Sequence, residues 1–173
     1  ADTSALAVPG LVIAGNGDFT FDSDHADYNA LALGDPDTRT VTYEVTDTSG
    51  GTGTGTFDIV ITGTNDDPIA AAADFTGETI TEDLVFTSTG KLTDAGTDVD
   101  TGDTLTASAD QANPPSKGTV VVNGDGTFTY TPALNETGND TFGFFINDQV
   151  GSQSNSATAT VTITAVNDAP TGV

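Results

Sequence analysis

The chain has 173 residues, which is room for one or two domains, and its 26 acidic residues against 3 basic ones give a formal net charge of −23 at pH 7. This charge excludes nucleic acid as an ordinary partner, because phosphate binding requires clusters of Lys and Arg, and it argues against an anionic membrane surface. The absence of cysteine removes disulfides and thiol chemistry. The acidity either serves solubility alone or holds cations, and the second alternative requires the carboxylates to cluster.

The apolar residues are arranged as in strands. They make up 35 % of the chain, and a low apolar fraction with high net charge favours disorder. Here, however, Val, Ile, Phe and Tyr alternate with polar residues, which is typical of β-strands. No stretch has a helical period over three turns, and no apolar run approaches the roughly 20 residues of a membrane helix. We therefore predict an all-β protein with a thin core.

The first elements form a hairpin and a longer strand pair. After an uninformative start (1–9), short apolar runs at 11–13 and 19–21 flank Asn16-Gly17, and Asn-Gly favours the positive φ of a tight turn. The next strands are expected at 40–45 and 57–62, joined by a turn at 47–51. The second strand leads into Asn65-Asp66-Asp67-Pro68, where proline favours an extended exit.

The second half begins with weak patterning and ends with strong strands. Phe75 and Ile80 are the expected inward residues of the stretch 69–81, and Leu84-Val85-Phe86 and Leu92 indicate strands. A carboxylate-dense loop follows at 94–103. Further strands are expected at 105–107, 118–122, 128–131, 142–146 and 159–164, before the exit Asn167-Asp168-Ala169-Pro170.

These elements repeat. Residues 10–21 match 118–130 with one residue inserted, and the two Asn-Asp-x-Pro exits lie 102 residues apart. Asp47 likewise matches Asp148. The second copy has a long segment before its hairpin, whereas the first has only nine residues. We therefore predict two tandem Greek-key β-sandwich units of cadherin-like or immunoglobulin-like type, the first truncated at its N-terminal side. The expected boundaries are a partial unit at 1–64, an acidic linker at 65–68, a complete unit at 69–166 and an exit linker at 167–173.

The repeats carry a family resemblance. The first unit, with GNGDFTFDSD, TVTYEVTDTSGG and FDIVITGTNDDP, resembles the second half of a bacterial VCBS-type repeat. The second, with TEDLVFTSTGKLTDAGTDVDTGDTL, KGTVVVNGDGTFTYTPALNETGNDTF and VNDAP, resembles a complete bacterial cadherin-like repeat. The resemblance implies β-sandwich units strung end to end in large secreted surface proteins, often RTX-type adhesins, with Ca²⁺ at the junctions.

The resemblance also implies two sets of calcium ligands, one at each pole of the second unit. The first set is Asp98, Asp100 and Asp148 with Asn65, Asp66 and Asp67 of the linker; the second is Glu82, Asp140, Asn167 and Asp168. Alternation along Asp98-Val99-Asp100 predicts both carboxylates on one side and Val99 facing the core. The competing interpretation is a solvated turn with incidental acids. The first unit departs from the pattern, because Arg39 stands where Asp140 stands in the second, although Asp35 and Asp37 could compensate.

Other chemistry has little support in the sequence. His25 is the only histidine and lies in a polar loop, so a zinc site of ordinary ligand composition and a serine–histidine catalytic pair are both implausible. Asp98 and Asp100 could act as a glycosidase pair, but the chain has no Trp for sugar subsites. We therefore expect no enzymatic activity.

Three functional hypotheses remain. The leading one is a calcium-stabilised extracellular module that acts as a rigid spacer or adhesion segment of a large bacterial surface or biofilm protein. The second is a carbohydrate-binding cadherin-like module. The third is a self-assembling extracellular fibre subunit, in which a strand from a neighbouring subunit completes the short first unit. The expected partners are neighbouring repeats of the same polypeptide or neighbouring subunits, and carbohydrate in the second hypothesis; no nucleic acid and no membrane insertion are expected.

Overall fold

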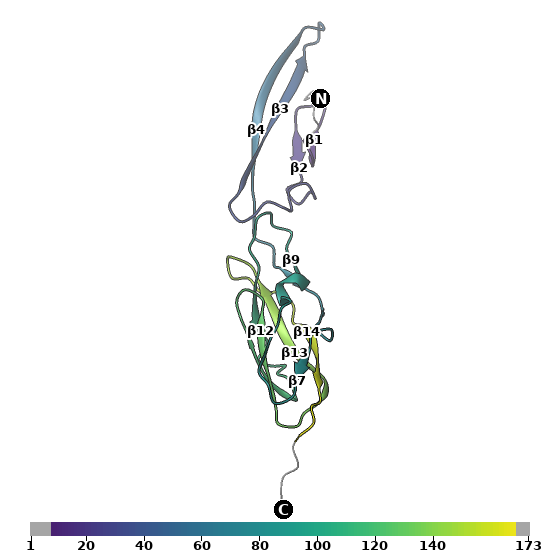
Figure 1. Cartoon of the computed structure of the whole chain (residues 1–173). Helices are drawn as coiled ribbons and strands as arrows, with labels where there is room; N and C mark the ends of the chain where they lie inside the picture. Colours follow the sequence, from purple (N-terminus) through teal and green to yellow (C-terminus); the bar gives the residue numbers. More distant parts are fainter. Residues whose placement is uncertain (1–7, 169–173) are drawn as a thin grey trace, which may run out of the picture. The chain divides into compact units, whose positions relative to one another are not determined.

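The computed structural model describes residues 8–168 and divides into two compact units (Figure 1). The first contains residues 8–66 together with the loop 99–102, and the second contains 67–98 and 103–168. The elements of the described residues are strands, apart from one short 3₁₀ helix, η1 (Leu92–Ala95), which confirms the all-β prediction. No helix in this part of the chain is long and apolar enough to cross a membrane.

The first unit is built from two antiparallel pairs. Strands β1 (Leu11–Ile13) and β2 (Phe19–Phe21) form the predicted hairpin, in which Gly17 takes the positive φ of 91° that the turn requires. Strands β3 (Pro36–Thr46) and β4 (Thr52–Thr62) pair along their whole length of 11 residues. An aromatic contact joins the two strand pairs, because the ring centroid of Phe19 in β2 lies 5.4 Å from that of Phe57 in β4.

The core of the first unit is thin. Val8, Tyr28, Val41 and Ile61 are its buried apolar residues among those described. The hydroxyl of Tyr28 donates to the carbonyl of Pro9, which holds the chain entering β1 against the loop that contains Tyr28. Large apolar side chains of the same unit remain exposed, namely those of Val12, Phe19, Leu33, Val45 and Val60. The expectation of a thin core therefore holds for this unit.

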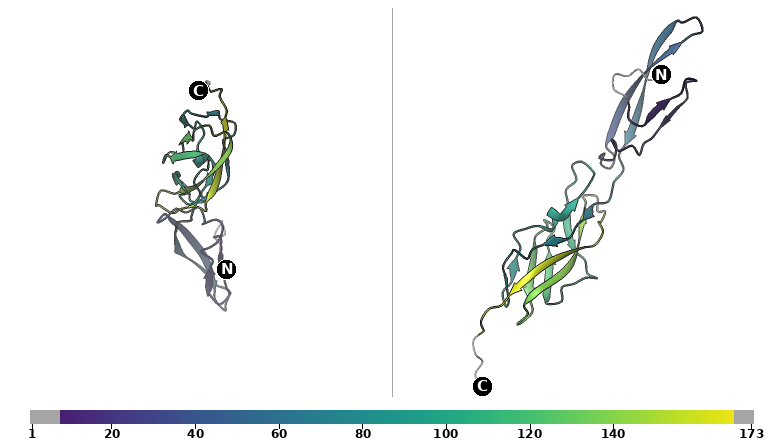
Figure 2. Two further views of the ribbon diagram at one scale, coloured as in Figure 1. Left: turned by 90° about the horizontal axis from the view of Figure 1, so that it is seen from below. Right: turned by 90° about the vertical axis from the view of Figure 1, so that its right-hand side faces the viewer.

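The second unit contains two larger sheets. The first sheet has the order β10 (Thr106–Ala109), β13 (Gly138–Asn147), β14 (Ala157–Thr164) and β6 (Ala73–Asp74), with β7 (Ile80–Thr81) also on β14. The second has the order β11 (Gly118–Val122), β12 (Phe128–Pro132) and β8 (Phe86–Thr87). A small pair joins β5 (Ile69–Ala70) to β9 (Gly96–Thr97). Figure 2 shows β13 and β14 side by side along their length.

Alternating residues of both sheets fill one core. On β14, Ala159, Val161 and Ile163 are at most 2 % exposed while their neighbours face outward. Phe128 is central: its ring centroid lies 4.9 Å from that of Phe75 and 5.1 Å from that of Phe142. Phe75 and Ile80 point inward as predicted.

Two expected strand assignments are wrong. Leu84 and Val85 are exposed and precede the strand, which begins only at Phe86. The reason is local: Asp83 has a left-handed φ of 65°, which turns the chain before β8. Leu92 lies in η1 instead of a strand, although its side chain is fully buried.

Candidate metal site

The candidate site is the loop that follows β9 and precedes β10. Its first end is held where Thr97 pairs with Ile69, and its second end is held where Thr106 pairs with Asn147. Between them, Gly102 adopts a φ of 94°, a conformation that side-chain-bearing residues rarely adopt. The chain therefore reverses within a few residues and returns Asp103 toward Asp98.

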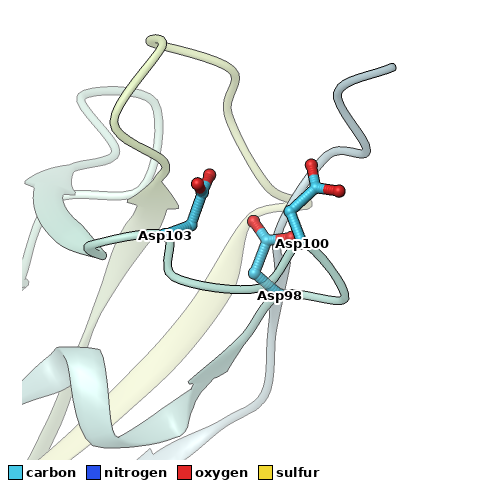
Figure 3. Close-up of side chains that lie close together, drawn as sticks. All are labelled: Asp98, Asp100 and Asp103. Atoms are coloured by element: carbon cyan, nitrogen blue, oxygen red, sulfur yellow. The ribbon is translucent and has the colours of Figure 1, made fainter. Parts of the chain in front are cut away.

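Three carboxylates of this loop converge. One oxygen each of Asp98, Asp100 and Asp103 lies within 4.8 Å of the other two (Figure 3). Asp100 is only 4 % exposed, and the other two are half-buried. Asp98 Oδ2, Asp100 Oδ1 and Asp103 Oδ2 are each shielded from solvent. Like charges held this close raise the free energy of the loop unless a cation neutralises them.

Neighbouring groups orient two of these side chains. The backbone N–H of Asp66 donates to Asp100 Oδ2 at 2.9 Å. The side-chain amide of Gln149 donates to Asp103 Oδ1, also at 2.9 Å. Each bond engages one carboxylate oxygen and fixes the orientation of its side chain. The arrangement therefore presents preoriented oxygen ligands of the kind that hard divalent cations prefer.

The sequence prediction identifies part of this cluster. Asp98 and Asp100 do lie on one side of the loop, as expected, but Val99 is 47 % exposed and does not face the core. Its exposure follows from the loop geometry, because the strand of β9 ends at Thr97 and the alternation ends with it. Asp103 and Gln149 were not predicted. The signal for Asp103 was the glycine before it, since a turn at Gly102 brings a third Asp back to the first two.

The linker residues take other positions. Asp66 reaches the cluster through its backbone N–H, and the side chains of Asp66 and Asp67 are exposed. The side-chain amide of Asn65 donates to the carbonyl of Asp66 at 2.8 Å. At the second exit Asn167 makes the same bond to the carbonyl of Asp168, at 3.2 Å. The repeated motif thus folds its Asn side chain onto the following peptide.

Asp148 is a turn residue in this structure. It is buried, and its Oδ1 accepts the backbone N–H groups of Val150, Gly151 and Ser152. Its counterpart Asp47 accepts two backbone N–H groups with its own Oδ1 in the turn between β3 and β4. The correspondence between these two aspartates is therefore reflected in geometry: each closes the turn that joins the two longest strands of its unit.

Asp140 forms a saturated polar centre under the second sheet. Oδ1 accepts from the N–H and the hydroxyl of Ser116, and Oδ2 accepts from the N–H of Lys117 and the hydroxyl of Tyr130. Burial opposes ionisation and is the largest single influence, but these hydrogen bonds outweigh it, and the pKa of Asp140 lies below its ordinary value. The pKa of Tyr130 is raised, mainly by burial of the phenol and secondly by its hydrogen bond to the Asp140 carboxylate. Both oxygens of Asp140 are engaged without a cation.

Glu82 makes a comparable local contact. It is buried, and its Oε1 accepts the backbone N–H of Val166 at 2.7 Å. Among residues 8–168, only the loop cluster brings three or more acidic or histidine side chains close enough to share an ion. Glu82, Asp140 and Asp168 form no such group.

In the first unit, Arg39 is neutralised locally. Asp140 pairs across the ladder with Val161 in the second unit, and Arg39 pairs in the same way with Ile59. Arg39 forms an ion pair of 2.7 Å with Asp37, and its guanidinium lies 5.6 Å from the ring centroid of Tyr28. Asp37 therefore balances the charge of Arg39.

The fold and the cluster together define a class. The second unit is a two-sheet β-sandwich with an acidic loop between β9 and β10. Residues 65–165 match the family model described as bacterial cadherin-like domain, and the chain belongs to that family.

Comparison with one solved structure agrees on the fold. The crystal structure of Drosophila N-cadherin EC1-4 matches with a TM-score of 0.55 and 14 % identity, over 92 % of this chain and 41 % of that one. Two structures of an endo-fucoidan hydrolase of glycoside hydrolase family 107 match with TM-scores of 0.43 and 0.42, at 18 % and 16 % identity, over 96 % of this chain and 23 % of theirs. The chain thus spans less than half of each. No curated protein matches it.

Proposed function

We propose that this chain is a non-catalytic, calcium-stabilised module of a large bacterial surface protein, where it acts as an extracellular spacer or adhesion segment. Membership of the bacterial cadherin-like family supports the adhesive, extracellular role. The observation that carries the calcium assignment is the convergence of Asp98, Asp100 and Asp103. The likeness of the first unit to VCBS-type repeats, and the RTX-adhesin context, remain predictions.

The ligand chemistry selects Ca²⁺ among common cations. Ca²⁺ takes six to eight oxygens from carboxylates, carbonyls and water in flexible geometry, whereas Mg²⁺ requires a near-ideal octahedron and holds its water firmly. Zinc is disfavoured because its sites use Cys and His, and the chain has no cysteine and one histidine. Asp98, Asp100 and Asp103 would supply the anionic ligands, and backbone carbonyls of the loop and water would complete the shell.

Binding would act on stability by two routes. A cation neutralises three converging charges, and it also ties together a loop whose ends are held at β9 and β10. A ligand present at about 100 times its dissociation constant adds roughly 2.7 kcal/mol to the free energy of unfolding. That corresponds to several degrees in the unfolding midpoint of a domain of this size.

The test is a thermal melt in calcium and in EDTA. We expect calcium to raise the midpoint of the wild-type chain and the double variant Asp98→Asn/Asp100→Asn to lose most of that increase. The matched control is Asp24→Asn/Asp58→Asn, which removes the same charge from exposed positions and should keep the full increase. His25→Ala should also keep it. A wild-type midpoint that is indifferent to EDTA would refute the calcium assignment.

A further inference from the structure

The two units share a register that allows a residue-by-residue comparison. In the second unit, Phe142 pairs with Ala159 across β13 and β14, and in the first, Val41 pairs with Phe57 across β3 and β4. Phe142 lies six residues before Asp148, and Val41 lies six residues before Asp47. Strand β3 is therefore the structural counterpart of β13, and β4 that of β14.

The counterpart strands differ in their partners. Strand β13 is paired on both sides, with β14 on one and β10 on the other. Strand β3 pairs with β4 alone among the residues that the structure describes. In the second unit β10 runs antiparallel to residues 144–147, so the corresponding edge of β3 is Tyr43–Thr46, on which the described residues place no strand.

Side-chain exposure at equivalent positions differs between the two units. Ile146 is fully buried and pairs with Ala107 of β10, whereas its counterpart Val45 is 59 % exposed. The hairpins show the same difference, since Phe128 is fully buried and its counterpart Phe19 is 55 % exposed. Equivalent positions are thus buried in the second unit and exposed in the first.

The uncovered residues border a groove. It has a volume of about 650 Å³ and lies between the β1–β2 hairpin and the end of β3, lined by Ile13, Phe19, Tyr43, Val45 and Phe57 among others. The groove is partly apolar, and Glu44 also lines it. An exposed strand edge beside such a groove is the geometry that β-strand addition uses: backbone hydrogen bonds provide affinity, and alternate side chains enter the groove.

The second unit and the charge of the first indicate the chemistry of the occupant. Strand β10, Thr-Ala-Ser-Ala, is uncharged and places a small apolar side chain, Ala107, opposite Ile146. Residues 8–66 carry ten acidic side chains and one arginine, and the whole chain has a charge of −23, so a second copy would be repelled. We propose that the edge Tyr43–Thr46 is an acceptor for an uncharged, extended peptide segment that runs antiparallel to β3 and places a small apolar residue opposite Val45.

A graft onto the full chain tests the acceptor edge. Gly118 follows Ala109 at the spacing at which Gly10 follows Ala1. A copy of Leu105–Ser108 joined directly before Ala1 therefore offers the sequence Leu-Thr-Ala-Ser-Ala at the spacing of β10. The tether makes the pairing intramolecular and raises its effective concentration into the millimolar range. The control graft carries Ala107→Asp within the copied segment, which places a charge opposite Val45.

The readout is amide exchange of the residues in Tyr43–Thr46 whose N–H groups face away from β4. We expect roughly tenfold slower exchange in the graft, no change in the control graft, and the same protection from excess free Leu-Thr-Ala-Ser-Ala peptide. Unchanged exchange in a graft that keeps the exchange pattern of β13 and β14 would overturn the proposal. It would also be overturned if these amides were already protected in the ungrafted monomer, or became protected with rising concentration of that chain, which would identify a second copy as the occupant.

Discussion

The hydroxyl of Tyr130 donates a 2.6 Å hydrogen bond to the carboxylate of Asp140, and both side chains are buried. The bond joins β12 of one sheet to β13 of the other, so it links the two layers of the second unit through a polar contact inside an apolar core. Hydrogen bonds to a charged group in such surroundings contribute more than bonds between neutral groups.

Removal of this hydroxyl tests the contribution directly. We expect Tyr130→Phe to lower the free energy of unfolding of the second unit by about 2 kcal/mol, because Asp140 Oδ2 then keeps only the N–H of Lys117. Chemical denaturation followed by amide exchange on β14 measures the loss. Tyr43→Phe removes the same atom from the first unit and should change the exchange of β14 little. Equal effects of the two substitutions would contradict the assignment.

The same pair predicts how stability depends on pH. The pKa of Asp140 is lowered in the fold, so its stabilisation is present above the ordinary carboxyl value of about 3.9 and is lost as the pH falls through the folded value. The pKa of Asp110 is lowered too, first by the hydroxyl of Ser156 and then by Asn113 and the N–H of Ala112. Thermal melts across acid pH should show the decline, and Asp140→Asn should make it less steep.

At alkaline pH, the stability contributed by Tyr130 changes with pH in the opposite direction. Because the pKa of Tyr130 is raised, the neutral phenol is favoured in the fold, and this stabilisation declines as the pH rises above the ordinary value of about 10. We expect the midpoint of the second unit to fall above that pH in the wild-type chain and to fall less in Tyr130→Phe. A parallel decline in both chains would assign the alkaline loss to other groups.

Asp103 and Asp148 should respond differently to calcium. Asp103→Asn should reduce the calcium-dependent increase in midpoint, because Asp103 belongs to the cluster. Asp148→Asn should lower the midpoint by a similar amount in calcium and in EDTA, because Asp148 Oδ1 accepts three turn amides. Melts of both variants in both conditions decide this. A larger loss for Asp148→Asn in calcium would add Asp148 to the ligands.

The equivalent phenylalanines should differ in energetic weight. Phe128→Ala should destabilise the second unit by about 3–5 kcal/mol, since the ring is fully buried and contacts three other rings. Phe19→Ala should cost the first unit much less, because Phe19 is 55 % exposed. Amide exchange resolves the two units separately. A comparable cost at both positions would show that the groove beside Phe19 is filled in solution.

The strands with strong alternation were predicted from the sequence. The prediction failed where the backbone angle of a single residue determines the path of the chain. Alternation located β14 because that strand has one buried face, and both hairpins were located by short apolar runs on either side of a glycine turn. It failed at Leu84 and Val85, where the left-handed Asp83 turns the chain, and at Val99, beyond the end of β9. In the acidic loop, the family resemblance indicated Asp98 and Asp100. The place of Asp103 depends on the reversal at Gly102, and that of Gln149 on a turn distant in sequence, which periodicity does not encode.

Strand direction in the two units has a mechanical consequence. In the first unit, β3 and β4 form a hairpin, and Pro36 pairs with Thr62 at its open end. Tension that pulls Pro36 and Thr62 apart would break the hydrogen bonds of this hairpin one pair at a time. In the second unit, β6 and β7 run parallel to β14. Tension between the two ends of that unit would load these strand pairs in shear, and their hydrogen bonds would have to break together. Under load the chain would therefore lengthen in two stages, with the first unit extending at low force while the second resists.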